Sequence, residues 1–129
     1  MGILLDTDIL IDIARGREQA LRFLQSLQGE VVAVSHLSVA ELLVGARTVR
    51  ERDVVEKFVK TFVILAPDAM VSERALALIK TYHHVCGTGI IDAYIAATAI
   101  EFDMTLCSRN AKHFSPIREL SMNIPYTLT

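Results

Sequence analysis

Several residue types and patterns are scarce or missing in this sequence, and each absence excludes a class of protein. The two cysteines, Cys86 and Cys107, lie far apart and lack CxxC spacing, so we expect reduced, buried thiols rather than a disulfide framework. No uncharged apolar run reaches about 18 residues, so no transmembrane helix is expected. Asp6 and Asp8 stand where a signal peptide would be apolar, and we therefore expect a cytoplasmic protein.

The charge balance also lacks a strong bias. The 129 residues carry a formal net charge of −2, and 52% of them are hydrophobic, which excludes a disordered chain. We expect residues 1–129 to form a single domain that is large enough to bury a core. Because there is no global excess of basic residues, a nucleic-acid partner would have to be held by a local patch or through metal ions.

The start of the chain combines a short apolar run with acidic residues. Residues 3–5 read as a strand that is buried on both faces, and an amphipathic helix follows at 9–14. Asp8 alone fits the N-cap of that helix. Asp6 stands directly at the end of the strand, which is where open α/β sheets place functional groups, so it is a candidate site residue.

Apolar strands and amphipathic helices alternate along the rest of the chain. We expect further strands at 31–34, 63–65 and 104–107, with a last edge strand at 124–128. Helices are expected at about 20–27, 39–44, 50–62, 71–82 and 93–102, and a loop at 83–89. This alternation predicts an α/β class protein, a three-layer α/β/α sandwich with a central parallel sheet of four to five strands.

Polar residues follow the ends of several predicted strands. In a parallel sheet these ends share one edge, so the residues that follow them become neighbours in space. The candidates are Asp6, Glu41, Asp92, and the run Ser108, Arg109 and Asn110. Three acids and an amide at one edge would suit Mg²⁺ or Mn²⁺, which prefer oxygen ligands.

Each candidate also has a purely structural interpretation. Glu41 with Ser38 fits a capping box, and Asp92 fits an N-cap or a first-turn acid favoured by the helix dipole. The run 108–110 fits a simple turn. The four histidines have no mutual metal-ligand spacing, so we interpret them as solvated or locally hydrogen-bonded side chains: His36, His83, His84 and His113. These separate roles do not explain why the acids gather at one edge.

Taken together, these motifs resemble the PIN-domain ribonucleases, and specifically the toxins of VapBC toxin–antitoxin pairs. The resemblance rests on residues 4–12, 38–42, 91–97 and 106–114 in this order and covers nearly the whole chain. It implies a PIN-like fold and a Mg²⁺-dependent endoribonuclease, with Mn²⁺ as a plausible substitute. It also implies a cognate VapB-like antitoxin as partner, and a homodimer. The family's acidic metal-site residues would be Asp6, Glu41 and Asp92.

The sequence departs from the family pattern in one place. Many members carry a fourth acid near the position of Asn110 to His113, but none of residues 108–114 is acidic here. Asn110 could supply a neutral carbonyl ligand. The choice between one and two metal ions therefore stays open.

The resemblance suggests a role for each candidate. Asp6 and Asp92 would hold the principal Mg²⁺, with Glu41 as a ligand or as the group that orients the attacking water. The arginine of the segment after the last central strand would contact phosphate. The other neighbouring polar residues would supply supporting hydrogen bonds or substrate contacts, which gives this set of candidates: Thr7, Asp8, Ser108, Arg109 and Asn110.

Two apolar stripes could exceed what a core requires. Residues 42–44 form one of them, and the other recurs at helical spacing over Val54, Val55, Phe58, Val59 and Phe62. Each stripe can be interpreted as a surface for a partner or as a face buried in the core, and we prefer the core interpretation.

Two rival functions compete with a ribonuclease. Asp6 and Asp8 also resemble the nucleophile and general acid of haloacid-dehalogenase-type phosphatases. That family requires a Ser or Thr, a Lys and then an acidic pair, whereas here Ser108 comes after Asp92 and no acidic pair follows. A catalytically weak PIN-like module that only binds RNA or protein is the other rival, supported by the missing fourth acid.

Overall fold

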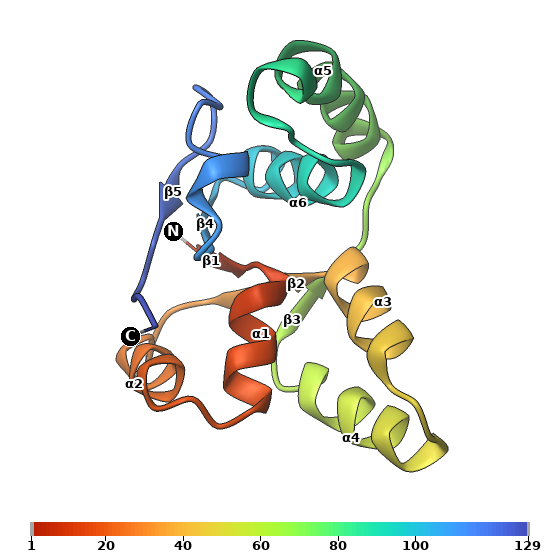
Figure 1. The fold of residues 1–129 in the computed structure, drawn as a ribbon, viewed down its shortest axis with the longest axis vertical. Helices are drawn as coiled ribbons and strands as arrows, with labels where there is room; N and C mark the ends of the chain where they lie inside the picture. The colour runs from red at the N-terminus through yellow and green to blue at the C-terminus, as the bar shows by residue number, and fades with distance from the viewer. Residues whose placement is uncertain (1, 129) are drawn as a thin grey trace.

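A fully parallel sheet runs through the centre of the computed structural model, which describes residues 2–128 (Figure 1). Its spatial order is β3-β2-β1-β4-β5, and neighbouring strands pair in parallel throughout. The strands are β1 (Gly2–Leu5), β2 (Val32–Ser35), β3 (Val63–Leu65), β4 (Met104–Cys107) and β5 (Met122–Asn123). The predicted parallel sheet is therefore confirmed, with five strands.

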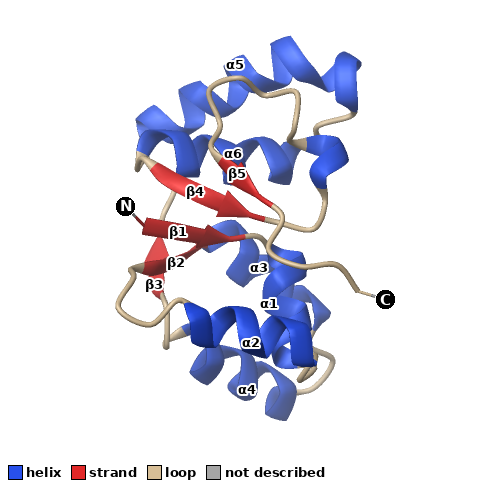
Figure 2. Ribbon diagram, turned by 90° about the vertical axis from the view of Figure 1, so that its left-hand side faces the viewer, coloured by secondary structure: helices blue, strands red, loops and turns tan. Residues whose placement is uncertain are grey.

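Helices cover both faces of this sheet. On one face lie α5 (Ala69–Cys86) and α6 (Ile90–Glu101), as Figures 1 and 2 show. The other face carries α1 (Thr7–Ala14), α2 (Glu18–Ser26), α3 (His36–Gly45) and α4 (Val49–Val59). A short 3₁₀ turn, η1 (Ala111–His113), follows β4. The predicted three-layer α/β/α sandwich is confirmed. Of the helices within residues 2–128, none has the length and apolarity needed to cross a membrane.

The central strands are apolar because both of their faces are buried. In β1, Leu4 packs in the core beneath α5 and α6, whereas its neighbour Leu5 packs in the core beneath α1 and α2. β4 divides in the same way, with Leu106 on the first side and Cys107 on the second. Strand side chains alternate between faces, so a strand between two helical layers requires an apolar residue at every position.

The last strand is not where the sequence predicts it. β5 occupies Met122–Asn123 and not 124–128, and its register is set by hydrogen bonds from Leu106 N to Ser121 O and from Ser108 N to Asn123 O. Pro125 comes two residues after the end of β5 and has no N–H to continue a ladder. The chain instead leaves the sheet and runs toward α2 (Figure 1), where the ring centroids of Tyr126 and Phe23 lie 6.1 Å apart.

The predicted loop at 83–89 is wrong in its first half. α5 continues to Cys86 and ends only at Gly87, whose φ of 74° places it in the left-handed region that glycine tolerates. The Gly87 N–H donates to the carbonyl of His83 and closes the last turn. Residues 87–89 alone therefore connect α5 to α6.

Candidate active site

The site candidates gather where the strand order reverses. β1 lies between β2 and β4, so the chain leaves β1 toward one side of the sheet and later returns to its other side. Ligand sites in open α/β sheets form at such switch points, outside the carboxyl ends of the strands. Asp6 follows β1 there and Ser108 follows β4, and the Asp6 N–H donates to the carbonyl of Cys107 at 3.0 Å.

Asp6 is buried, with 6% of its surface exposed, and both of its carboxylate oxygens are held. Oδ1 accepts a hydrogen bond from the Thr7 N–H at 2.8 Å, and Oδ2 accepts one from Ser108 Oγ at 2.7 Å. Burial, followed by the negative charges of Asp8 and, to a smaller extent, Asp92, raises the pKa of Asp6 to about 7. A carboxylate in this environment is stabilised by a cation.

Asp8 does not cap α1, so that interpretation is wrong. The helix begins at Thr7 with Asp6 as its N-cap, and Asp8 lies within the first turn. Its Oδ2 accepts a hydrogen bond from the Arg109 N–H at 3.0 Å. Its Oδ1 is buried and has no hydrogen-bond partner among residues 2–128, and burial raises the pKa of Asp8. Such an orphaned oxygen is costly unless a ligand satisfies it.

Glu41 reaches the first turn of α1 from α3. The Thr7 hydroxyl donates to Glu41 Oε1 at 2.6 Å and also lies 2.9 Å from Ser38 Oγ. The capping-box interpretation of Ser38 and Glu41 is wrong, because Ser35 caps α3 and its Oγ accepts from the Leu37 N–H. Glu41 therefore lies one turn inside the helix, with its carboxylate held beside the residue that follows Asp6.

Asp92 lies in the first turn of α6 rather than at its N-cap, which is Gly89. Its Oδ2 accepts from the Gly89 N–H at 3.4 Å and lies 3.0 Å from His113 Nδ1. The sequence did not indicate His113 as part of the site, because the four histidines lack mutual metal-ligand spacing and the family pattern places an acid in this segment. Its position just after the strand end at Ser108 was the available signal.

Arg109 is bound to an acid that the sequence did not single out. Its Nε donates to Asp12 Oδ2 at 2.6 Å and its Nη2 to Asp12 Oδ1 at 3.3 Å, and Asp12 itself is buried. The Tyr126 hydroxyl donates to the same Oδ2 at 2.8 Å. This contact opposes the expected phosphate role for the guanidinium. The Asn110 N–H donates to Ser108 Oγ, so this run mainly positions Asp6.

These residues suit a divalent cation chemically without forming a closed cage. Among residues 2–128, no three His, Cys, Asp or Glu side chains lie in an arrangement that could hold a metal ion as they stand. The orphaned oxygen of Asp8, and the burial and neighbouring carboxylates that raise the pKa of Asp6, nevertheless describe a negative region in which a cation would be stabilised. Carboxylate oxygens are the ligands that Mg²⁺ and Mn²⁺ prefer, so the donor set fits such an ion.

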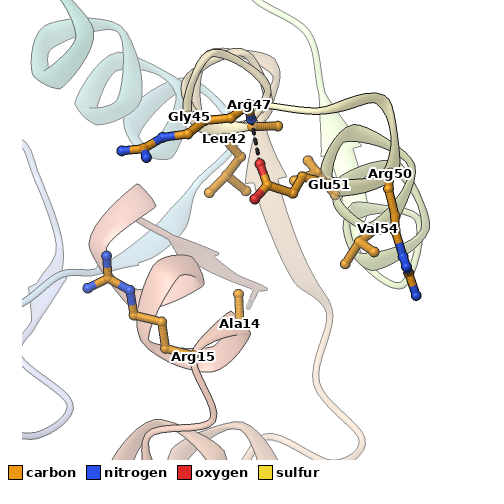
Figure 3. A pocket seen from close by; sticks show the side chains of 10 residues that line it. Ala14, Arg15, Leu42, Gly45, Arg47, Arg50, Glu51 and Val54 are labelled. Atoms are coloured by element: carbon orange, nitrogen blue, oxygen red, sulfur yellow. Dashed lines mark hydrogen bonds between the residues drawn. The ribbon is translucent and has the colours of Figure 1, made fainter.

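A hollow away from the acidic residues lies between the ends of α1, α3 and α4 and has a volume of about 600 Å³ (Figure 3). Leu42 and Val54 supply apolar surface around it, and Arg15, Arg47 and Arg50 supply positive charge. Glu51 adds one carboxylate, which accepts a hydrogen bond from the Arg47 N–H. Val54 is 62% exposed. The core interpretation of the two apolar stripes thus holds for residues that pack inward, such as Val59, and does not hold for Val54 or Val44.

Comparison with known proteins agrees with this geometry. A sequence model of the PIN domain matches residues 3–119. The chain belongs to the PIN-domain family. Ribonuclease VapC10 of Mycobacterium tuberculosis is 34% identical to this PIN domain over 122 residues, which cover 92% of this chain and 90% of the relative. Ribonuclease VapC1 of Methanocaldococcus jannaschii is 31% identical over 126 residues, covering 95% and 85%.

A solved structure shares the fold of this PIN domain closely. A toxin-antitoxin complex from Klebsiella pneumoniae contains a chain with a TM-score of 0.84 and 31% identity, which covers 98% of this chain and 100% of that one. PIN nucleases in general use divalent metal ions. The family assignment replaces the haloacid-dehalogenase alternative, whose nucleophile and general acid would have been Asp6 and Asp8.

Proposed function

We propose that this protein is a divalent-metal-dependent endoribonuclease and the toxin of a type II toxin–antitoxin pair. The observation that carries the proposal is the buried Asp6 carboxylate at the switch point, which lies in the field of Asp8 and Asp92. Its relatives of 34% and 31% identity are named ribonucleases, which supports RNA as the substrate. We also propose that the protein acts in the cytoplasm, because that is where a ribonuclease toxin would meet cellular RNA.

The residues divide between binding the ion and orienting its ligands. Asp6 and Asp92 would hold the ion, for which we propose Mg²⁺, with Mn²⁺ as a substitute. The ion would supply an activated water and shield the charge of the phosphodiester. Glu41 would orient the attacking water, since the Thr7 hydroxyl fixes its carboxylate beside the strand end. Ser108 holds Asp6 by a buried hydrogen bond and so keeps its carboxylate in place.

Cleavage of a mixed pool of structured RNA tests this proposal. The purified protein, freed of any antitoxin, is incubated with Mg²⁺, Mn²⁺ or EDTA beside an Asp92→Asn variant. We expect discrete cuts with either ion and none with EDTA, and a loss of at least about a hundredfold in the variant, because a carboxylate that would hold the ion is removed. Intact RNA, with a protein that remains folded and gains no stability from Mg²⁺, would favour the rival module that only binds.

We further propose that a VapB-like antitoxin binds in the hollow between α1, α3 and α4. Structural relatives of this chain come from toxin-antitoxin complexes, which supports such a partner. The apolar surface of Leu42 and Val54 lies beside three arginines and one glutamate, so the charge around the hollow is positive on balance and suits a segment that carries both apolar and acidic side chains. The resemblance also implies a homodimer, which sedimentation of the purified protein would test.

A Val54→Asp substitution should weaken antitoxin binding at least about tenfold, because it places a charge on the apolar surface of the hollow. RNA cleavage should not change, since Val54 lies outside the acidic site. The measurement is titration calorimetry with the cognate VapB-like antitoxin. Val49→Asp is the matched control, because Val49 lies on the same helix, is 64% exposed and does not line the hollow. Equal weakening by both variants would contradict the assignment.

A further inference from the structure

The imidazole of His113 lies against the carboxylate of Asp92. Nδ1 of the ring lies 3.0 Å from Asp92 Oδ2, and 34% of the side chain is exposed. This is the length of a hydrogen bond, and it is also the separation of two adjacent donor atoms around one ion with bonds of about 2.1 Å. When Nδ1 offers its lone pair to an ion, Nε2 can carry the ring proton.

The backbone that carries His113 is firmly anchored. Its carbonyl accepts a hydrogen bond from the hydroxyl of Thr88 at 2.9 Å, and Thr88 is completely buried. Thr88 belongs to the connection 87–89 that leads into α6, the helix that carries Asp92. Phe114, the next residue, is also completely buried in the core. The same connection therefore fixes both partners, which means that the imidazole is placed beside Asp92 by the fold.

His113 differs chemically from the other side chains of the site. Asp6, Asp8, Glu41 and Asp92 offer only carboxylate oxygens, whereas His113 offers a nitrogen. Mg²⁺ and Mn²⁺ both take carboxylate oxygens, but Mn²⁺ is a transition-metal ion and accepts an imidazole nitrogen more readily than the harder Mg²⁺ does. A nitrogen beside Asp92 would therefore favour a transition metal over Mg²⁺ at this site.

We propose that His113 is a nitrogen ligand of the divalent-metal site and shifts its preference from Mg²⁺ toward Mn²⁺. This inference rests on the proposed function, since it assumes that Asp92 binds the ion of a metal-dependent nuclease. It assigns the segment after β4 a direct role in choosing the metal. That role is independent of the RNA sequence that is cut.

The test observes the bound ion directly rather than cleavage. Mn²⁺ is added to the purified protein, and pulsed electron paramagnetic resonance records the modulation caused by coordinated ¹⁴N. We expect nitrogen modulation in the wild type, its change after labelling with ¹⁵N-histidine, and its loss in His113→Asp and His113→Gln. The exposed His84 lies on α5, and His84→Asp is the control that should retain the signal. Circular dichroism verifies that each variant is folded.

Affinities for the two ions provide the second measurement. Titration calorimetry should show that His113→Asp lowers the ratio of Mn²⁺ to Mg²⁺ affinity at least about tenfold, as expected when a nitrogen ligand becomes an oxygen ligand. Bound Mn²⁺ without nitrogen modulation, or an unchanged ratio, overturns this inference and leaves the nuclease proposal intact. A wild type that binds neither ion overturns both, and this result separates the two failures.

Discussion

Replacing Asp6 by asparagine should abolish metal-dependent RNA cleavage and at the same time stabilise the metal-free protein near neutral pH. The amide can still accept the N-cap hydrogen bond from Thr7, but it cannot carry the negative charge that an ion requires. We expect the loss of cleavage to be at least about a hundredfold. Stability rises because the variant removes a buried charge that Asp8 and Asp92 repel.

The direction of the stability change follows from how the free energy of unfolding depends on pH. Asp6 has a pKa of about 7 in the folded protein against an ordinary value of 3.8, so the folded state binds more protons between these values. The stabilisation by this group is complete below its unfolded pKa and is lost as the pH rises through about 7. Urea unfolding in EDTA should show wild-type stability falling over this window, by an amount on the order of a few kcal/mol.

The Asp6→Asn variant should lose the part of this slope that Asp6 causes. A matched control is Asp68→Asn, because Asp68 is also an N-cap carboxylate, which accepts from the Val71 N–H at the start of α5. The control should retain both the wild-type slope and RNA cleavage. Full cleavage by Asp6→Asn would remove Asp6 from the site, and an unchanged slope would show that another group titrates there.

Replacing Asp12 by alanine should cost about 3 kcal/mol of unfolding free energy, the lower end of the range for removing one partner of a buried ion pair. The buried Asp12 carboxylate receives the guanidinium of Arg109 and the hydroxyl of Tyr126. Arg109 is partly exposed and can recover some hydration, which limits the cost. Chemical denaturation at neutral pH measures the change.

Cleavage should also fall in the Asp12→Ala variant under conditions where it remains folded. The backbone of Arg109 holds Asp8, and its neighbour Ser108 holds Asp6, so this segment connects Asp12 to the acidic site. Tyr126→Phe is the milder control. It removes one hydrogen bond, should cost about 1 kcal/mol and should leave cleavage close to wild type. Equal stability of the Asp12→Ala variant and wild type would contradict a structural role for this ion pair.

The strand-end acids could be predicted because a parallel sheet brings the ends of distant strands to one edge. Asp6 and Ser108 meet there, as the alternation of strands and helices implies. Local capping was harder to assign. Asp6 and Asp8 have the same capping chemistry and lie two residues apart, so the sequence alone did not distinguish the cap from the first-turn acid.

Contacts that depend on the path of an irregular segment could not be predicted. Tyr126 reaches Asp12 because the chain leaves the sheet after β5, and no periodic pattern encodes that route. His113 reaches Asp92 because residues 87–89 anchor the turn after β4. Each contact joins two segments whose relative position is fixed by the core rather than by local sequence.

The pairing of β1 with β4 has a consequence for synthesis. Gly2 pairs with Met104 and Leu5 with Cys107, so the centre of the sheet joins segments that lie about a hundred residues apart. Such non-local pairing forms late, because the intervening chain must first be ordered. During synthesis β1 can pair with β2 early, but the opposite edge of β1 stays unpaired until β4 has been made. The nascent polypeptide therefore carries Asp6 long before Ser108 exists, and the buried hydrogen bond between them can form only after β4 has been synthesised.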